Sequence, residues 1–510
     1  MKPTSAEASD RGGADVLGPV LTRLITGALV AVALAAILGW LFLAVSHLQD
    51  RYEVGHVQGA WMGLEQYANE GTLYPPLFDG VHYGGTRWMP LPILLNATAA
   101  RITGEYLVSG KLVGLVLTAG LLVLVFFALR RFETPKELAA ALAATVVATD
   151  TGRIAGTTLG GDVLPVLLQV GALVVATSGR KKRSLVVAGV LAGLALASKT
   201  TGVWAALALF TWLGLDRRWR DLAFFGAAFG VTTAVVLGAV ELVSSGRFSD
   251  NLVVLTFAGV GGGVGPIRAP NQVLYQLATF GPAVWALVPF AAAGALIAPL
   301  RRISVYHLAL GWAFLLLLGT YTDVGAGFNQ LLDVTVLTVL AVGHLAGRLD
   351  VSRLRTPMAT ILALVVIWGT TTGIVLTLVP DIRATVEGAS LGYPLHPLTG
   401  LVGPTDEILS EDPYVPLSLG RKPVVLDPFM LRRLDIVDPA AVDVLIGRIE
   451  NHEFAYIVTV VPLTALDGDT VDNNYWWNNF HFGLRVVGAM RRAYVMQGVV
   501  DGYYVYRPGP

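Results

Sequence analysis

Long apolar segments fill most of the first 380 residues and restrict this chain to one class of fold. A helix of roughly 20 apolar residues spans the hydrocarbon core of a bilayer. With 54% hydrophobic and only 14% charged residues, the composition also belongs to the membrane class. We therefore predict a polytopic α-helical membrane protein with about 11 transmembrane helices. The predicted spans are 24–47, 106–129, 135–149, 162–178, 184–199, 202–215, 221–243, 276–298, 303–319, 328–347 and 357–379.

Basic residues occupy alternate connections between these spans. They are Arg130, Arg131 and Lys136, then Arg180, Lys181, Lys182 and Arg183, then Arg217, Arg218 and Arg220, then Arg301 and Arg302, and finally Arg348, Arg353 and Arg355. Cytoplasmic connections are enriched in Lys and Arg. We therefore predict a protein of the cytoplasmic (inner) membrane, with residues 1–23 as a cytoplasmic tail and 24–380 as the transmembrane domain. The loops 48–105, 150–161, 244–275 and 320–327 are then extracytoplasmic.

Two short apolar segments refine this topology. Pro90 to Thr103 has about 14 residues, which is short for a span, so we predict a helix in the outer interface. The alternative, a true crossing with another helix miscounted, stays open. The segment 184–215 has basic flanks and is interpreted as two helices that turn at Lys199. Each helix would be about 22 Å long, so Lys199 should be recessed, either meeting an anionic group or reaching to water.

The composition changes after Pro380. Short β-branched and aromatic runs at 423–427, 454–460 and 503–506 are typical of buried strands. Residues 438–451 have helical apolar spacing. We predict a small extracytoplasmic α/β domain over 381–510. It has no GxGxxG motif or P-loop, and the absence of cysteine excludes disulfides.

Charged residues on the predicted outer side are the candidates for chemistry. They are Glu53 and His56, the loop with Asp150, Arg153 and Asp162, the tip at Lys199, and the segment from Gly325 through Asn329 to Asp333. A carboxylate can take the proton of an attacking hydroxyl, and cations can stabilise a departing phosphate. Structural explanations stay open. Asp162 could serve the helix dipole, Glu53 could be solvated, and His56 could be structural. Asp150 could pair with Arg153, and Asp333 could bond a neighbouring helix.

The order of these features resembles the GT-C superfamily of membrane glycosyltransferases, especially bacterial relatives of protein O-mannosyltransferases and aminoarabinose transferases. The resemblance covers roughly residues 20–350. It rests on Glu53 after the first helix, Gly71-Thr72-Leu73-Tyr74, Trp88-Met89-Pro90-Leu91, Gly161-Asp162, Ser198-Lys199, and Gly325 to Asn329. Two departures stand out: many relatives have Asp at the position of Glu53, and an Arg where this chain has Gly161.

The resemblance implies a sugar donor on a polyprenyl phosphate, inversion at the sugar, and a cell-envelope glycan, lipid or protein as acceptor. Glu53 is then the candidate base and Asp162 a second acidic site residue. Lys199 is the candidate phosphate contact, and Arg87 or Arg153 could supply the missing charge. Tyr74 and Asn329 are further site candidates. No metal ligand is assigned, and use of a divalent metal is left open.

Two other function classes are weighed against this one. The first is a transporter or flippase for a lipid or solute, although the chain shows no clean internal repeat of the kind that transporters carry. The second is a non-catalytic scaffold that has kept the fold. The net charge of zero gives no case for nucleic-acid binding.

Overall fold

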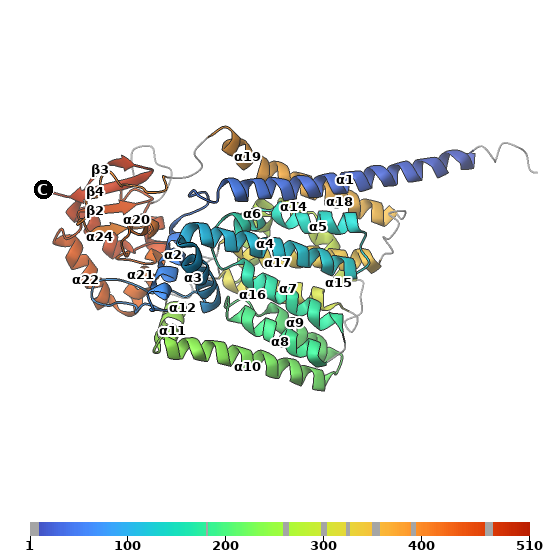
Figure 1. Cartoon of the computed structure of the whole chain (residues 1–510), viewed down its shortest axis with the longest axis horizontal. Helices are drawn as coiled ribbons and strands as arrows, with labels where there is room; N and C mark the ends of the chain where they lie inside the picture. Colours follow the sequence, from blue (N-terminus) through green and yellow to red (C-terminus); the bar gives the residue numbers. More distant parts are fainter. Residues whose placement is uncertain are drawn as a thin grey trace, which may run out of the picture.

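The computed structural model describes residues 10–179, 182–258, 265–296, 303–322, 327–348, 357–388, 394–464 and 473–510. The molecule is elongated and has two parts (Figure 1). One is a bundle of helices along the long axis. The other is a smaller mixed domain at one end, which we call the C-terminal domain (residues 394–510).

The bundle is built from apolar helices that run back and forth. They are α1 (Asp10–Ser46), α4 (Tyr106–Arg131), α5 (Lys136–Val147), α7 (Val163–Ser178), α8 (Lys182–Leu196), α9 (Trp204–Leu215), α10 (Trp219–Val243), α13 (Ala269–Phe280), α14 (Pro282–Trp285), α15 (Val288–Leu296), α16 (Val305–Thr320), α17 (Leu331–Arg348) and α18 (Pro357–Gly373), which continues through η5 (Ile374–Leu378) into α19 (Val379–Val386). Within the described ranges, five helices are long and apolar enough to cross a membrane, or up to seven if two bent pairs each form one span. The chain is thus a multi-pass membrane protein, and the number eleven stays a prediction.

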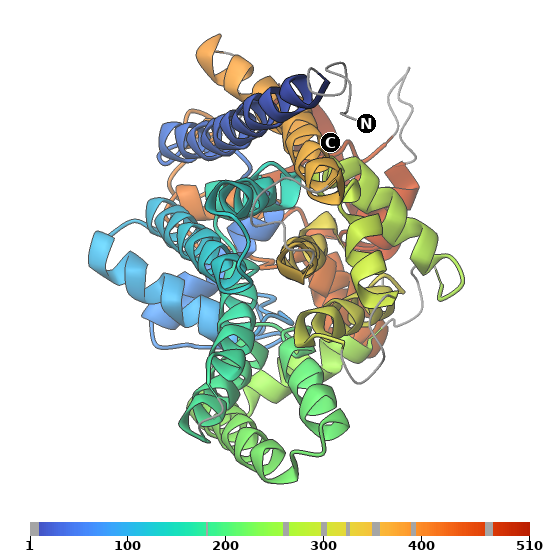
Figure 2. The ribbon, with the colours of Figure 1, turned by 90° about the vertical axis from the view of Figure 1, so that its right-hand side faces the viewer.

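The helices differ sharply in how deeply they pack. The apolar stretch that includes α17 is 83% buried, whereas that of α10 is only 11% buried. In a view along the bundle, α17 lies in the middle and α10 at the edge (Figure 2). Because α10 is apolar yet exposed, its free surface suits contact with lipid rather than with other helices.

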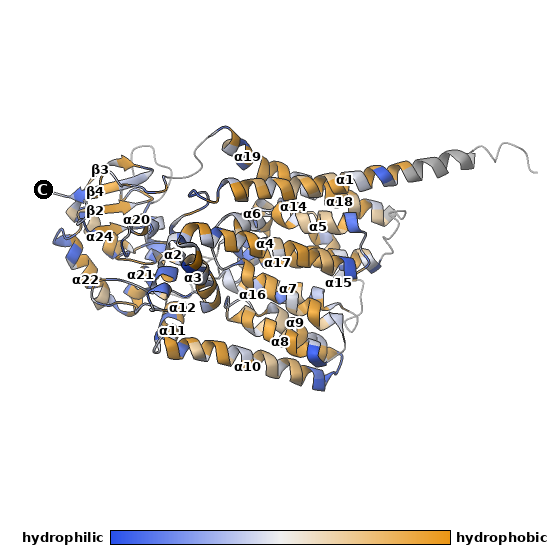
Figure 3. Ribbon diagram, in the orientation of Figure 1, coloured by the Kyte–Doolittle hydropathy of each residue, from blue (hydrophilic) through white to orange (hydrophobic). Residues whose placement is uncertain are grey.

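Polar residues gather at the ends of the bundle (Figure 3). Helix α4 ends at Arg130 and Arg131, and α5 begins at Lys136. This end lies far from the C-terminal domain (Figure 1). The run directions therefore agree with the predicted alternation, while the cytoplasmic assignment itself stays a prediction. Arg180, Lys181, Arg301, Arg302, Arg353 and Arg355 lie outside the described residues.

The first span was predicted well, and two other local expectations were wrong. The apolar stretch Val20–Ser46 agrees with the predicted span 24–47, and helix α1 extends it back to Asp10, because extending an existing helix costs far less than nucleating one. The supposed loop 150–161 contains α6 (Asp150–Thr157), which bends by 74° from α5. The supposed single span 276–298 is broken at Gly281, where the helices diverge by 112° and Pro282 lacks the N–H that would continue the first one.

The first loop, residues 48–105, folds on the end of the bundle near the C-terminal domain. It contains α2 (His56–Asn69) and α3 (Pro90–Thr103). Helix α3 has the predicted bounds: Pro90 sits at a favoured first-turn position, and Gly104 stops the helix with φ of 80°. It lies across the bundle axis, as an interfacial helix should (Figures 1 and 2). Three short elements of the next long loop pack against residues 75–86 of this first loop. They are α11 (Arg247–Ser249), η1 (Asp250–Val254) and α12 (Leu255–Phe257).

The C-terminal domain contains a four-stranded sheet with the order β1-β2-β4-β3. Its strands are β1 (Ile408–Ser410), β2 (Tyr456–Thr459), β3 (Tyr494–Val500) and β4 (Tyr503–Pro508), and its helices are α20 (Tyr414–Ser418), α21 (Pro428–Val437), α22 (Pro439–Glu450), α23 (Asn473–Asn479) and α24 (Leu484–Ala493). Strands β1 and β2 are parallel, and the other pairs are antiparallel. The expected strand 423–427 is not in this sheet. Instead Val425 forms a single parallel bridge with Tyr83 of the first loop.

A buried ion pair fastens this domain to the bundle. Arg51, directly after α1, donates to the Asp412 carboxylate at 2.8 Å and to the Tyr503 hydroxyl at 2.6 Å. Its guanidinium also lies 4.1 Å from the ring centre of Tyr414. Breaking this contact would leave a buried charge without its partner, which is costly. The contact therefore holds the C-terminal domain at the end of α1.

Candidate active site

Glu53 lies in a strained turn just beyond α1. Its φ is 56°, which is uncommon for a residue other than glycine. The Thr158 hydroxyl donates to the Glu53 carbonyl at 2.9 Å. The Glu53 carboxylate accepts from Arg153 Nη1 at 2.8 Å and is 30% exposed. The turn therefore presents a partly accessible carboxylate that is held by a nearly buried cation.

Arg153, in α6, is the centre of a wider cluster. Besides Glu53, its guanidinium pairs with Asp381 at 2.9 Å and Asp150 at 3.4 Å, and it donates to the Tyr52 hydroxyl. Burial raises the pKa of the Tyr52 hydroxyl, which therefore stays protonated and donates to Asp381 at 2.6 Å. We call Tyr52, Glu53, Asp150, Arg153 and Asp381 the arginine cluster.

Lys111 holds the backbone next to this cluster by hydrogen bonds. It lies in α4, is only 1% exposed, and donates to the carbonyls of His47 at 2.6 Å, Asp50 at 2.7 Å and Tyr52 at 3.2 Å. The last carbonyls of a helix lack partners within the helix. The three carbonyls that Lys111 bonds follow the end of α1 at Ser46, so Lys111 fixes the turn that leads from α1 to Glu53.

A second cluster surrounds Lys199, at the turn between α8 and α9. Its Nζ donates to Asp162 Oδ1 at 2.7 Å, and Asn329 Nδ2 donates to Asp162 Oδ2 at 3.0 Å. The side chains of Lys199 and Asp162 are 16% and 32% exposed. We call Asp162, Lys199 and Asn329 the lysine cluster. Asp333 accepts from Trp204 Nε1 at 2.7 Å, so it bonds a neighbouring helix. Gly325 and Ala326 lie outside the described residues.

Residues 150–162 join the two clusters in one segment. Arg153 belongs to the first cluster and Asp162 to the second, while Thr158 between them bonds Glu53. The start of α3 reaches the same place, because Leu91 N donates to the Ala197 carbonyl at 3.2 Å, two residues before Lys199. Both clusters therefore lie at the bundle end that carries the C-terminal domain.

Gly161 explains one departure from the family pattern. A Cβ built at this position would lie 2.8 Å from the ring of Trp61, closer than real contacts allow. Trp61 in turn stacks on Trp88, with ring centres 4.7 Å apart. A larger side chain at position 161, such as arginine, would therefore collide with Trp61.

The other predicted site residues make their described contacts elsewhere. His56 begins α2 and packs edge-on against His481 of the C-terminal domain, with ring centres 4.2 Å apart. Burial, with a smaller effect of His481, holds the pKa of His56 well below its usual value, so it is neutral. Buried Tyr74 donates to the Trp88 carbonyl at 2.7 Å. The Arg87 guanidinium lies 5.2 Å from the ring centre of Phe429. Their roles as site residues stay predictions.

Sequence reasoning missed Asp381, Tyr52 and Lys111. Each carried a signal: Asp381 is an acid at the end of the last apolar span, Tyr52 adjoins Glu53, and Lys111 is a charge inside a span. A charge within a transmembrane helix is costly and marks a functional or anchoring position. In the described part of the chain, no group of three or more His, Asp or Glu side chains is arranged to hold a metal ion.

Solved structures share this fold. ArnT from Cupriavidus metallidurans in the apo state aligns with a TM-score of 0.59 at 15% identity, covering 95% of this chain and 99% of that chain. ArnT bound to undecaprenyl phosphate aligns with a TM-score of 0.59 at 14% identity and the same coverage. The oligosaccharyltransferase from Archaeoglobus fulgidus, in complex with zinc and sulfate, aligns with a TM-score of 0.52 at 15% identity over 93% of this chain and 72% of that chain.

These likenesses define the class of fold. The chain has the GT-C glycosyltransferase fold, as the sequence motifs indicated. At such low identity the similarity establishes the fold and not the chemistry. No protein-family model matches the sequence, and no curated protein matches it either.

Proposed function

We propose that this protein is an integral-membrane glycosyltransferase. It moves a sugar from a polyprenyl-phosphate donor to a cell-envelope glycan, lipid or protein at the outer face of the cytoplasmic membrane. One observation carries the proposal. Glu53 and Asp162, each with its own cation, are joined through residues 150–162 at one end of a GT-C bundle. In this proposal that end, with the C-terminal domain, is extracytoplasmic.

Glu53 is the general base of the proposed reaction. The acceptor hydroxyl attacks the anomeric carbon on the face opposite the phosphate, and its proton passes to the Glu53 carboxylate. The bond between the anomeric carbon and the phosphate oxygen breaks, and its electron pair leaves with the polyprenyl phosphate. The configuration at the sugar inverts. Arg153 acts here by orienting Glu53, because its guanidinium is shared among three carboxylates.

Lys199 stabilises the departing phosphate. It is a compact cation held by one carboxylate, Asp162, which Asn329 steadies from the other side. A preorganised cation at the point where charge develops can lower the barrier by several kcal/mol. The similar structure of ArnT bound to undecaprenyl phosphate supports a lipid phosphate as the donor's leaving group.

Release of polyprenyl phosphate tests the proposal. Protein in nanodiscs is given a panel of polyprenyl-phosphate sugars and a cell-envelope extract as acceptor source. We expect turnover by wild type and a loss of about a hundredfold in Glu53→Gln, the scale of a lost general base. Glu105→Gln, a change in the same loop outside both clusters, is the matched control. Repeating the assay after chelation and re-addition of Mg²⁺ or Mn²⁺ tests metal use.

Two results would count against the proposal. Equal turnover by wild type and Glu53→Gln would remove Glu53 from the catalytic role. Sealed-vesicle transport of a lipid-linked sugar, without sugar transfer by the same preparation, would favour the transporter class.

A further inference from the structure

Helix α10 exposes an apolar stripe along its length. Val231, Val235 and Leu242 are all exposed, and their spacing places them on one face of the helix. Residues 222–240 carry no charge and extend roughly 28 Å along the helix, close to the thickness of about 30 Å of a bilayer's hydrocarbon core. Glu241 and Leu242 therefore mark the level at which α10 leaves the hydrocarbon core.

The chain turns sharply where α10 ends. Ser245 and Gly246 have positive φ angles of 54° and 87°, and they lead directly into the short elements α11, η1 and α12. Ser249 N donates to the Glu241 carboxylate at 3.0 Å, which holds these elements against the end of α10. Figure 1 shows α11 and α12 beside that end. Residues 247–257, which we call the rim segment, therefore lie at the level where α10 leaves the hydrocarbon core.

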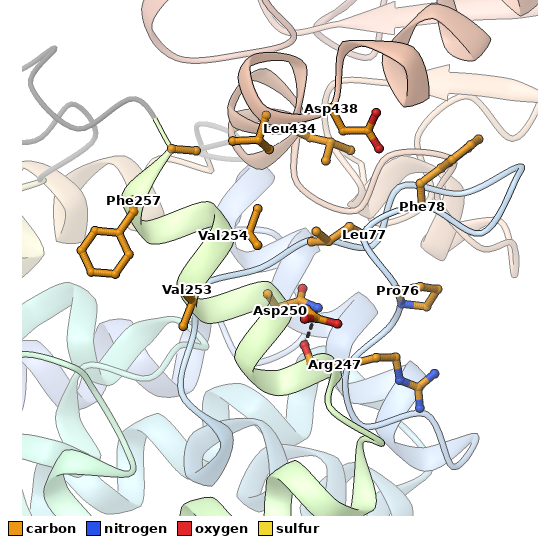
Figure 4. Close-up of a pocket in the computed structure, with 13 residues that line it drawn as sticks. Pro76, Leu77, Phe78, Arg247, Asp250, Val253, Val254, Phe257, Leu434 and Asp438 are labelled. Carbon is orange, nitrogen blue, oxygen red and sulfur yellow. Dashed lines mark hydrogen bonds between the residues drawn. The ribbon is translucent and has the colours of Figure 1, made fainter.

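The rim segment has a buried and an exposed face. Asn251 and Leu255 are buried, whereas the side chains of Val253 and Phe257 are 52% and 72% exposed. Val253 and Phe257 are about one turn apart, so they lie on the same face. Figure 4 shows both side chains pointing away from Leu77 of the first loop. Neighbouring apolar side chains that stay exposed mark a surface for contact with protein or membrane.

The lipid bilayer is the partner that fits this exposed face. The stripe of α10 suits contact with lipid and ends at Leu242, whose side chain is 81% exposed, and the rim segment begins at the same level. Its charged residues, Arg247 and Asp250, lie at its start, and residues 251–258 carry no charge. An interfacial helical segment buries its apolar face at the boundary between lipid headgroups and acyl chains. The exposed face therefore continues the lipid-facing surface of α10.

Buried polar bonds tie the rim segment to two other parts of the protein. Asn251 accepts from Thr86 N, in the first loop, at 2.8 Å. Arg433 of the C-terminal domain is fully buried and donates to the carbonyls of Leu255 at 3.1 Å and Ala258 at 2.8 Å. The exposed face cannot turn inward without breaking these bonds, and breaking them would leave buried polar groups unsatisfied.

We propose that the rim segment is a membrane-contact element, with Val253 and Phe257 inserted at the boundary between lipid headgroups and acyl chains. The loop 244–275, predicted from the sequence as an extracytoplasmic connection, is then seated on the bilayer over part of its length. Because the rim segment bonds both the first loop and the C-terminal domain, its contact with lipid fixes the height of both above the membrane. The inference is independent of the proposed sugar transfer.

Spin labels test the position of the rim segment, because the chain has no cysteine and single cysteines can be introduced. Full-length Val253→Cys and Phe257→Cys are labelled with a nitroxide in phosphatidylcholine nanodiscs. Relaxation by oxygen, which concentrates in lipid, is compared with relaxation by a water-soluble nickel chelate. The matched controls are Val235→Cys in the α10 stripe and Val499→Cys, an exposed position in β3 beyond the end of the bundle (Figure 1). We expect the ratio of oxygen to nickel relaxation at both rim positions to resemble that at Val235 and to exceed that at Val499 several-fold.

Two results would overturn the inference. A ratio at either rim position that resembles the ratio at Val499 would place the segment in water. Weak relaxation by both reagents would show that another protein surface covers this face. Each label replaces an exposed side chain, so all four variants should melt like the unlabelled protein, which shows that the labels report on the folded state. The samples contain neither donor nor acceptor, so failure of the proposed sugar transfer would leave these relaxation ratios unchanged.

Discussion

Two cations at the bundle end that carries the C-terminal domain are held in opposite ways. Arg153 is 7% exposed and shares its guanidinium among Glu53, Asp150 and Asp381. Lys199 is 16% exposed, and within the described residues one carboxylate, that of Asp162, bonds it at 2.7 Å. An ammonium has three N–H donors. Lys199 therefore keeps N–H donors for a ligand, whereas the guanidinium of Arg153 already pairs with three carboxylates of the protein.

This difference predicts that the two cations have different roles. A cation surrounded by carboxylates orients them and offsets their repulsion. A cation that hydrogen-bonds one carboxylate, as Lys199 bonds Asp162 while Asp333 attracts it without a hydrogen bond, keeps N–H donors for a further anion. The comparison predicts that losing Arg153 damages stability and activity together, while losing Lys199 damages donor use alone.

Arg153→Met should have the largest effect. Three carboxylates would lose their shared cation, and we expect a destabilisation of about 2 kcal/mol, less than for a fully buried pair because the carboxylates are partly exposed. Turnover should fall about a hundredfold, since Glu53 loses its orientation. Thermal unfolding and polyprenyl-phosphate release measure both. Arg383→Met, which removes an exposed pair with Glu387, is the control and should change neither. Full stability and activity in Arg153→Met would show that Arg153 does not orient the carboxylates as proposed.

Lys199→Gln should come next and act on the donor. We expect the KM for the lipid-linked sugar to rise about tenfold, the scale of one lost charge-assisted hydrogen bond, with only a small shift in melting temperature. Steady-state kinetics at several donor concentrations separates KM from kcat. A variant that melts as early as Arg153→Met would show that Lys199 is structural.

Asp381→Asn should come third. Asp381 accepts from the Tyr52 hydroxyl at 2.6 Å and pairs with Arg153 at 2.9 Å, so its loss loosens the turn that carries Glu53. We expect turnover to fall about tenfold, the scale of one lost charge-assisted hydrogen bond, measured as release of polyprenyl phosphate. Asp381→Glu should restore most of the rate. Wild-type turnover in Asp381→Asn would show that Asp381 only packs the end of α19.

Glu65→Gln should have the smallest effect on activity, because it acts on stability alone. Glu65 lies in α2, fully buried, and burial raises its pKa from 4.5 to about 8, with Asn96 opposing in part. The folded state thus binds this proton more tightly than the unfolded state. The resulting stability is fully present below about pH 4.5 and is lost as the pH rises through about 8. Melting temperatures from pH 5 to pH 9 should fall for wild type and less steeply for Glu65→Gln, with activity at neutral pH unchanged. Parallel melting curves for the two proteins would contradict the assignment.

Local features of the sequence were enough to predict much of the fold. The apolar spans, the bounds of α3 and the helix at 439–450 follow from apolar length and spacing, which are properties of neighbouring residues. The side on which Glu53, Asp162 and Lys199 meet follows from counting spans and basic loops. Where the chain bends, as at Gly281, the same counting placed one straight helix and was wrong.

The sequence by itself determined the class of protein, its charged candidates and the end of the bundle to which they belong, because burial in a membrane constrains every apolar segment separately. Only the tertiary structure decided which charges pair. Asp381 reaches Tyr52 across 329 residues of chain, and Arg87 packs on Phe429 rather than in either cluster. Such pairs depend on how distant helices pack, and the energy of an ion pair changes with distance and burial, neither of which the order of residues records.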